Sequence, residues 1–231
     1  MELRDAWERN AADWVRWARK PGHDSYWRFH RDRFLSLVPT PGRLTLDVGC
    51  GEGRVTRDLA ALGHRVIGVD ASETMIAAAR EAGTDGEYVV ADAAQLPFPD
   101  AHADLVVAFM SLMDVDDMHA AVGELARVLE PGGRLALAVV HPLNSAHEVD
   151  REQPEDRLVL VEDYFDRRRY TDTIERDDVK MTFESRHWTF EDYFDALLAP
   201  GFRIEAVREV GDPKHPRWSR YPLFLHVLLS R

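Results

Sequence analysis

The chain has 231 residues, with 41 acidic against 29 basic side chains, a formal net charge of −12 and a single cysteine, Cys50. The length fits one domain over residues 1–231, and a lone cysteine can form neither an internal disulfide nor a cysteine-rich zinc site, so we predict no metal and a reducing, cytoplasmic location. The acid excess would repel a phosphate backbone, which argues against nucleic acid as a partner.

The sequence shows no sign of export or of membrane insertion. The N-terminus has no basic segment followed by an apolar run, so no signal peptide is predicted. The longest apolar stretches, residues 105–110 and 135–140, are far shorter than the ~20 residues that span a bilayer. We therefore expect a soluble chain without a membrane partner.

The N-terminal region, residues 1–38, precedes the first predicted strand. A Pro21-Gly22 break divides it into two predicted helical pieces. It holds four of the six tryptophans: Trp7, Trp14, Trp17 and Trp27.

Short β-rich runs alternate with segments of helical periodicity in the middle of the chain. This alternation is typical of a parallel sheet with helices on both faces, so the predicted fold class is α/β. The predicted strands are residues 44–48, 65–69, 88–90, 103–109, 134–140, 202–210 and 223–229, and one of the last two is expected to run antiparallel near an edge. The predicted helices are residues 54–62, 73–82, 118–129 and 189–198.

Residues 144–186 do not belong to this alternation. The segment is dense in charge from Asp150 on, yet it contains an apolar run at residues 158–161 and an alternating pattern at residues 179–183. These patterns predict a β-like insertion or lid after the fifth strand rather than disorder.

A glycine-rich loop lies between the first predicted strand and the first helix of the alternating region. Gly49, Gly51 and Gly53 follow Asp47 there. Glycines let the backbone turn sharply and let a ligand approach the main chain, at the edge of the sheet where ligands of open α/β folds bind. A tight strand-to-helix turn without a ligand is the alternative interpretation.

A second acid strengthens the ligand interpretation. Asp70 ends the next predicted strand, about twenty residues beyond the loop, which suits a carboxylate that binds two ribose hydroxyls. A dinucleotide site would usually have the spacing G-x-G-x-x-G and an apolar residue at position 47, whereas this loop reads G-x-G-x-G after Asp47. The pattern therefore favours an adenosine-like ligand with an ammonium group for Asp47 over a pyrophosphate.

Four landmarks in chain order make the sequence similar to the class I S-adenosylmethionine-dependent methyltransferases. They are residues 47–53, which resemble the family's first motif, Asp70 as its ribose acid, residues 91–93 as its adenine-contacting segment, and residues 126–133 as the turn before its fifth strand. The resemblance implies a Rossmann-like sheet of seven strands, mostly parallel, with the last strand antiparallel. It also implies that residues 1–38 form a helical cap and that residues 144–186 cover the acceptor site.

The resemblance implies S-adenosyl-L-methionine as the cofactor and assigns residues to its parts. Asp47 and Gly49 would lie near the methionine part, Asp70 on the ribose, and Asp92 near the adenine amine. The further cofactor-binding residues implied are Gly51, Ala71, Met75, Ala93, Met110 and Ser111, with Trp14, Tyr26 and His30 closing from the N-terminal cap. Met75 can equally be plain core, and Trp7 and Trp17 are interpreted as packing anchors.

Two histidines are candidate bases for the methyl acceptor. His141 ends the fifth predicted strand, and His187 follows the insertion. The alternatives are that His141 caps strand-end backbone groups and that His187 packs under Trp188. Three acids after the fourth strand, Asp114, Asp116 and Asp117, could contact a cationic acceptor, but helix capping is the favoured interpretation.

Two kinds of nucleic-acid methylation are disfavoured by the sequence. Residues 109–112 carry no Asn-Pro-Pro-Tyr or Asp-Pro-Pro-Tyr pattern, which disfavours methylation of exocyclic base nitrogens, and Cys50 lies within the loop and cannot attack a pyrimidine. We predict an enzyme that methylates a small-molecule acceptor. The alternatives are a protein that binds the cofactor without methyl transfer and a nicotinamide (NAD(P))-dependent oxidoreductase. The oligomeric state is not predicted.

Overall fold

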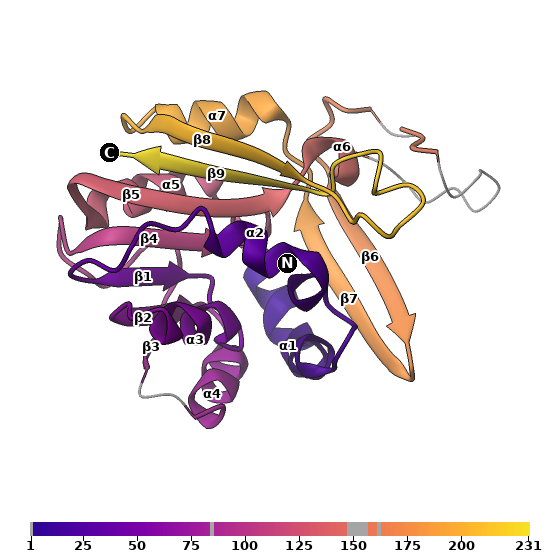
Figure 1. The fold of residues 1–231 in the computed structure, drawn as a ribbon, viewed down its shortest axis with the longest axis horizontal. Helices are drawn as coiled ribbons and strands as arrows, with labels where there is room; N and C mark the ends of the chain where they lie inside the picture. The colour runs from indigo at the N-terminus through magenta and orange to yellow at the C-terminus, as the bar shows by residue number, and fades with distance from the viewer. Residues whose placement is uncertain (1, 84–85, 147–156, 161–162) are drawn as a thin grey trace.

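A seven-stranded sheet forms the centre of the structure, a computed structural model that describes residues 2–83, 86–146, 157–160 and 163–231 (Figure 1). The strands follow the order β3-β2-β1-β4-β5-β9-β8. They are β1 (Thr45–Val48), β2 (Val66–Asp70), β3 (Glu87–Val90), β4 (Ala103–Phe109), β5 (Leu129–Val140), β8 (Arg203–Val210) and β9 (Phe224–Ser230). Each predicted strand has its counterpart, although β5 begins earlier than expected, at Leu129.

The strand directions confirm the predicted topology. Strands β1 to β5 run parallel to one another, whereas β9 pairs antiparallel with both β5 and β8. Because the parallel strands share one direction, their carboxyl ends meet at one edge of the sheet, where ligands of open α/β folds bind. This edge carries the candidate site described below.

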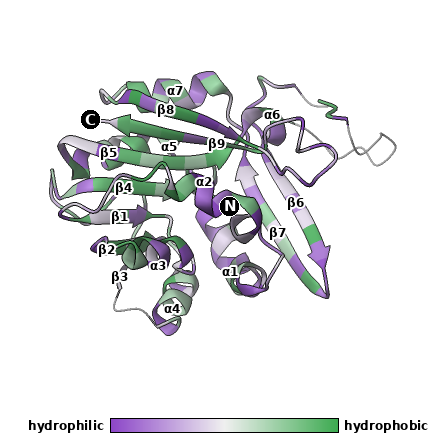
Figure 2. Ribbon diagram, in the orientation of Figure 1, coloured by the Kyte–Doolittle hydropathy of each residue, from purple (hydrophilic) through white to green (hydrophobic). Residues whose placement is uncertain are grey.

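Helices cover both faces of the sheet, as predicted. They are α3 (Arg54–Ala61), α4 (Glu73–Glu81), α5 (Met118–Val128) and α7 (Phe190–Leu198). Alternate strand residues point to opposite faces: Val106 and Leu135 pack in a core cluster with α5 and α7, whereas Leu105 and Ala136 pack with α3. Hydrophobic residues accordingly dominate the inner strands β4, β5 and β9 of the large sheet (Figure 2).

The N-terminal cap, residues 1–38, consists of α1 (Leu3–Arg19), the π-helical turn η1 (Tyr26–His30) and α2 (Arg31–Leu35). The predicted break at Pro21-Gly22 is confirmed, with Gly22 at a φ of +79°. Phe34 of α2 packs against the sheet together with Tyr26. Within the described ranges, no helix combines the length and the apolar character that a membrane span requires.

The predicted β-like insertion contains a two-stranded hairpin, β6 (Arg169–Arg176) and β7 (Val179–Arg186). It follows the short helix α6 (Pro142–Ser145) and lies beside α1 (Figure 1). The apolar run at residues 158–161 is not a strand: residues 157–160 have no regular structure, and Val161 lies outside the described residues. The alternation of apolar and polar residues at 179–183 therefore predicted a strand better than the apolar run did. It arises because one face of β7 packs on α1.

Candidate functional site

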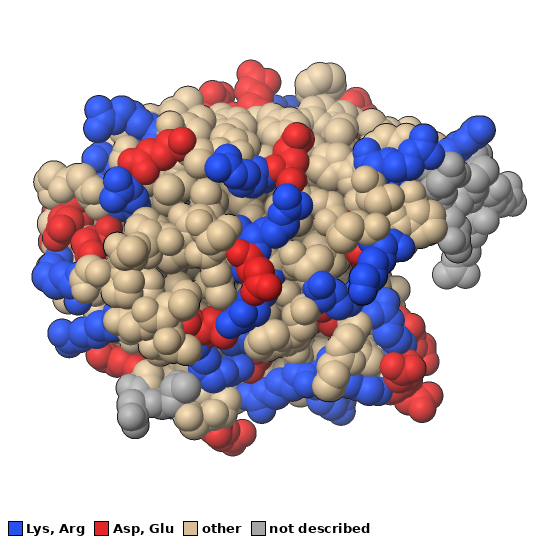
Figure 3. Space-filling model, viewed as in Figure 1, with Lys and Arg blue, Asp and Glu red and all other residues tan. Residues whose placement is uncertain are grey.

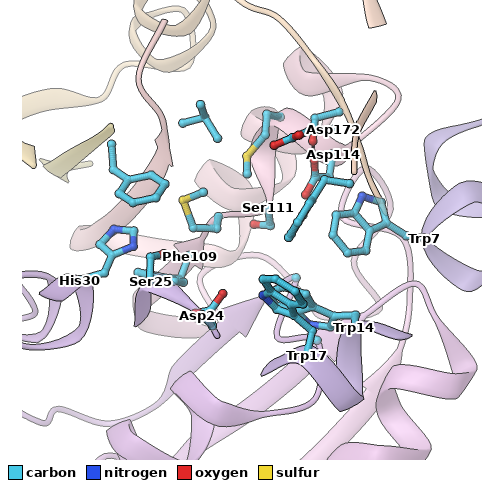
Figure 4. A pocket seen from close by; sticks show the side chains of 18 of the residues that line it. Trp7, Trp14, Trp17, Asp24, Ser25, His30, Phe109, Ser111, Asp114 and Asp172 are labelled. Carbon is cyan, nitrogen blue, oxygen red and sulfur yellow. Dashed lines mark hydrogen bonds between the residues drawn. The ribbon is translucent and has the colours of Figure 1, made fainter. Parts of the chain in front are cut away.

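One cavity of about 1090 Å³ lies at the carboxyl edge of the sheet, under α1 and the hairpin β6–β7. Its lining includes the glycine loop, the end of β2, the 3-10 turn η2 (Leu112–Asp114) and side chains of β6. Figure 4 shows side chains converging on this space from the cap, the sheet edge and the hairpin. Ligand pockets usually measure ~300–1,000 Å³, so this cavity has room for more than one small molecule.

The glycine loop forms the floor of one end of the cavity. Gly49, Gly51 and Gly53 adopt φ values of +76°, +55° and +83°, a region that only glycine enters without strain. The amide of Gly49 donates to the carbonyl of Val69 at 2.7 Å. A Cβ on Gly49 would lie 2.2 Å from Cβ of Ser111, which follows β4. The loop therefore needs glycine both for its turn and for the close approach of Ser111.

Gly49→Ala is expected to lower the free energy of unfolding by about 3 kcal/mol, because it adds a steric clash to the strain of a left-handed backbone. Gly83→Ala is the matched control, since Gly83 has a φ of +70° and no atom of the described residues within 4 Å of an added Cβ. That variant is expected to lose only about 1–2 kcal/mol in urea denaturation. Equal losses in the two variants would contradict the close packing of Gly49 against Ser111.

Asp70 lies at the end of β2 and orders the backbone around it. Its Oδ2 accepts a hydrogen bond from the Gly51 amide at 2.8 Å, and its Oδ1 accepts one from the Ser72 amide at 2.9 Å. Ser72 caps α4 as predicted, because its Oγ accepts from the Met75 amide at 3.0 Å. Glu8 of α1 accepts hydrogen bonds from Ser72 Oγ and Thr74 Oγ1 and so fastens the cap to this corner of the cavity.

Asp47 is fully buried beneath the loop and lines the cavity. Its Oδ2 accepts a hydrogen bond from Thr56 Oγ1 at 2.6 Å, whereas its Oδ1 has no partner within the described part of the chain. Burial raises the pKa of the Asp47 carboxyl to about 7. An acceptor atom that is buried, unpartnered and at the cavity wall fits a ligand that brings a cationic donor.

The Asp47 proton makes stability depend on pH. The native chain holds it more tightly than the unfolded chain, whose aspartates have a pKa near ~4, so the free energy of unfolding should fall as the pH rises from about 4 to about 7. Asp47→Asn is expected to remove up to about 4 kcal/mol of this fall, measured by urea denaturation across that range. Exposed Asp32→Asn should leave the profile as it is, and an Asp47→Asn profile equal to the wild type would contradict the burial of a protonated carboxyl.

The structure brings together almost all the residues that the sequence assigned to the cofactor. Those that line the cavity are Trp14, Asp47, Gly49, Gly51, Asp70, Ala71, Met75, Asp92, Ala93, Met110 and Ser111. Tyr26 does not line it, so that expectation is corrected. Its ring is fully buried against Phe109, and its hydroxyl donates to Asp58 at 2.6 Å. Cys50 is buried within the loop, and burial raises the pKa of its thiol, which suits the unreactive role expected for it.

Neither of the two histidines predicted as bases is among the residues that line the cavity, and this is a second correction. His141 accepts from the Leu143 amide at 3.2 Å and contacts Glu209 Oε1 at 3.0 Å, so it caps α6. His187 has both ring nitrogens engaged, one with Ser145 Oγ at 2.7 Å and one with the Tyr164 carbonyl at 2.8 Å. Burial lowers the pKa of both rings. The cap on α6 agrees with the alternative interpretation of His141.

The aromatic residues of α1 do more than anchor the cap. Trp7, Trp14 and Trp17 all line the cavity, and each ring contacts Phe183 of β7 edge-on at centroid distances of 6.4, 5.8 and 6.4 Å. Helix α1 and the hairpin therefore share one aromatic interface above the cavity. The helical spacing of the three tryptophans could be read from the sequence, but their contact with β7 could not.

The acids after β4 divide between capping and the cavity. Asp117 caps α5 by accepting from the Ala120 amide at 2.9 Å, as the favoured interpretation predicted. Asp114 instead lines the cavity and accepts from Ser185 Oγ at 2.5 Å, and burial raises its pKa to about 8. Figure 4 shows Asp114 and Asp172 across the cavity from His30.

A buried ion pair beside the loop was also missed. Arg54, the first residue of α3, lies 2.6 Å from Asp24 Oδ1, and both side chains are less than a tenth exposed. The Arg54 guanidinium lies 4.8 Å from the ring centroids of both Trp14 and Tyr26. An arginine directly after the last glycine of the loop was the signal available in the sequence.

These features fit S-adenosylmethionine. Asp47 offers an unpartnered buried acceptor for an ammonium group, Asp70 a carboxylate at a strand end for ribose hydroxyls, and the glycine loop leaves the backbone open to a ligand. Trp14 closes over the loop, since its Nε1 would lie 3.4 Å from a Cβ on Gly51. Fold and site together are similar to those expected of a class I S-adenosylmethionine-dependent methyltransferase.

Comparison with known proteins agrees with this class. Residues 46–137 match the family model of the methyltransferase domain. The chain is 39% identical over 119 residues to a demethylmenaquinone methyltransferase of Clavibacter sepedonicus, covering 50% of this chain and 48% of that protein. It is 34% identical over 110 residues to a malonyl-[acyl-carrier protein] O-methyltransferase of Pectobacterium atrosepticum, covering 47% and 44%. The matches thus span about half the length of these curated relatives.

A solved structure extends the likeness to most of the fold. The S-adenosylmethionine-dependent methyltransferase from Mesorhizobium loti superposes with a TM-score of 0.70 at 26% identity, over 90% of this chain and 98% of that one. Residues 46–137 thus match a methyltransferase domain, and most of the chain shares its fold with a solved S-adenosylmethionine-dependent methyltransferase.

Proposed function

We propose that this chain transfers a methyl group from S-adenosylmethionine to a small-molecule acceptor. The observation that carries the proposal is the continuity of one cavity from the glycine loop and Asp70, past Ser111, to Phe224 on β9. A cofactor held at the first end leaves the second end open for an acceptor. The names of the two relatives above state their acceptors, demethylmenaquinone for one and a malonyl group on an acyl-carrier protein for the other.

The chain contributes binding, orientation and exclusion of water. S-adenosylmethionine supplies a methyl group on a sulfonium, whose displacement needs alignment more than covalent help. Asp70 would bind the ribose hydroxyls, Asp92 the adenine amine and Asp47 the ammonium group. The interface of α1 with β7 covers the cavity, which strengthens these polar contacts by keeping water out.

We also propose that the methyl acceptor is not a nucleic acid and that the chain is located in the cytoplasm. On the face shown in Figure 3, basic side chains are interspersed with acidic ones rather than gathered in one patch, which supports the argument from a net charge of −12. The single cysteine, buried and free, supports a reducing compartment. Cofactor binding without methyl transfer and nicotinamide-dependent oxidation are not favoured by the family match.

The proposal is tested by incubating the chain with methyl-labelled S-adenosylmethionine and a protein-free and RNA-free extract of small molecules. We expect label in the extractable small-molecule fraction together with S-adenosylhomocysteine, and neither with Asp70→Ala. Label that enters only added RNA or protein would overturn the small-molecule acceptor. Absence of label from every acceptor, with S-adenosylhomocysteine bound normally, would favour the non-catalytic alternative.

A further inference from the structure

One part of the cavity is lined by rings and apolar side chains. We call it the ring-lined end; its residues are Phe29, His30, Phe109, Trp218, Leu223 and Phe224. Two ion pairs line the cavity with these rings, Arg28 with Asp212 at 2.6 Å and Asp24 with Arg54 at 2.6 Å. The rings and apolar side chains of this end therefore suit a flat aromatic molecule.

His30 is the polar ring within this apolar wall, and it is paired with a second histidine. Its Nε2 lies 2.5 Å from Nε2 of His226 on β9. His30 is 1% exposed and lines the cavity, whereas His226 is fully buried behind it and its Nδ1 has no hydrogen-bond partner among the described residues. When Nε2 of His30 donates its proton to Nε2 of His226, Nδ1 of His30 is the ring nitrogen that can accept from a molecule in the cavity.

Packing fixes the orientation of the His30 ring. It stacks on Phe224 at a centroid distance of 4.2 Å and an angle of 10°, and it contacts Phe109 at 4.6 Å. Phe109 ends β4, and Ser111, two residues further on, packs against Gly49 of the cofactor loop. His30 and the cofactor loop are thus joined through one short segment, and Figure 4 shows His30 beside Phe109 with Ser111 nearby.

The histidine pair is neutral near pH 7. Burial lowers the pKa of His30, and the neighbouring His226 lowers it further. Burial also lowers the pKa of His226 to about 4. A neutral imidazole held by a second neutral imidazole can accept a proton, and the hydrogen bond from its Nε2 then stabilises the imidazolium that forms.

We propose that the acceptor is a planar aromatic molecule that carries a hydroxyl group, that His30 takes the hydroxyl proton, and that His226 positions His30. This inference rests on the proposed methyl transfer. The acceptor O–H bond breaks and its proton goes to Nδ1 of His30, while the oxygen forms a bond to the methyl carbon and the electrons of the sulfur–methyl bond remain on sulfur. The proton leaves His30 for solvent when the cavity opens.

The test uses 2-naphthol as the probe and the full chain saturated with S-adenosylhomocysteine. Excited 2-naphthol gives up its proton to a base within hydrogen-bond reach and then emits as naphtholate, so its emission reports such a base without any turnover. We expect naphtholate emission from the probe bound to wild type and neutral naphthol emission from the probe bound to His30→Phe, which keeps the stacked ring. We also expect wild type to bind 2-naphthol about 5-fold more tightly than its methyl ether, because only 2-naphthol can donate a hydrogen bond to His30. His30→Phe should bind the two molecules equally.

His226→Phe tests the positioning role. We expect it to keep the affinity for 2-naphthol within about 3-fold and to reduce the naphtholate emission, because a single hydrogen bond holds the His30 tautomer. A preserved calorimetric affinity for S-adenosylhomocysteine shows that each variant is folded. If the chain does not bind S-adenosylhomocysteine at all, the proposed function fails. If it does bind, and naphtholate emission is equal in wild type and His30→Phe, or a matched amine binds better than the phenol, the inference about His30 is wrong.

Discussion

Asp70→Ala is expected to lower the affinity of the chain for S-adenosylhomocysteine by about 100-fold or more in calorimetry. Two hydrogen bonds from ribose hydroxyls to a charged carboxylate contribute roughly 1.5–3 kcal/mol each, and ~1.4 kcal/mol corresponds to a tenfold change. The substitution also removes the acceptor for the Gly51 and Ser72 amides, so it loosens the loop and the start of α4. Both effects weaken the same end of the cavity.

Two variants control this result. Asp32→Ala removes an acid whose side chain is 90% exposed, and it should leave the affinity unchanged. Asp70→Asn retains an acceptor for the two amides, and it should bind less tightly than wild type but more tightly than Asp70→Ala. An affinity of Asp70→Ala within a few-fold of wild type would show that Asp70 does not bind the ribose.

Arg54→Met is expected to lower the free energy of unfolding by about 3–5 kcal/mol, because it leaves the Asp24 carboxylate buried without its partner. The same change removes a cation from between the rings of Trp14 and Tyr26. Since Trp14 closes over Gly51, the affinity for S-adenosylhomocysteine should fall as well. Denaturation in urea and calorimetry measure the two effects separately.

A double substitution distinguishes the loss of the ion pair from the loss of packing. Arg54→Met with Asp24→Leu removes both charges, so much of the stability lost in Arg54→Met should return. Arg33→Met, at an exposed arginine, is the control for the loss of a positive charge. If the double variant is no more stable than Arg54→Met, the cost arises from the arginine's packing rather than from an unpaired carboxylate.

The cofactor end of the site could be predicted from sequence because its signals are local. Gly49, Gly51 and Gly53 are needed for left-handed turns within one loop, and Asp70 ends the next parallel strand, so the topology places it beside the loop. Strand and helix positions followed from hydrophobic periodicity for the same reason. Each of these inferences depends on neighbours that lie within one βαβ unit.

The acceptor end could not be predicted in this way, because its residues come from distant parts of the chain. His30 and His226 are 196 residues apart in sequence, and only the position of β9 beside β5 brings β9 under η1. His141 was predicted from its place at a strand end and His187 from its place after the insertion, but Glu209 and Ser145 engage their nitrogens. Tyr26 was expected at the cofactor, but the π-helical turn directs it to Asp58.

A crystal structure of the chain with S-adenosylhomocysteine tests the central claim most directly, because it shows where the cofactor lies and what surrounds its sulfur. We expect the ribose hydroxyls on Asp70, the adenine beside Asp92, the ammonium group near Asp47, and the sulfur facing the ring-lined end that contains His30. Electron density for the ligand away from the glycine loop, or a sulfur that faces a wall closed to any acceptor, would contradict the account.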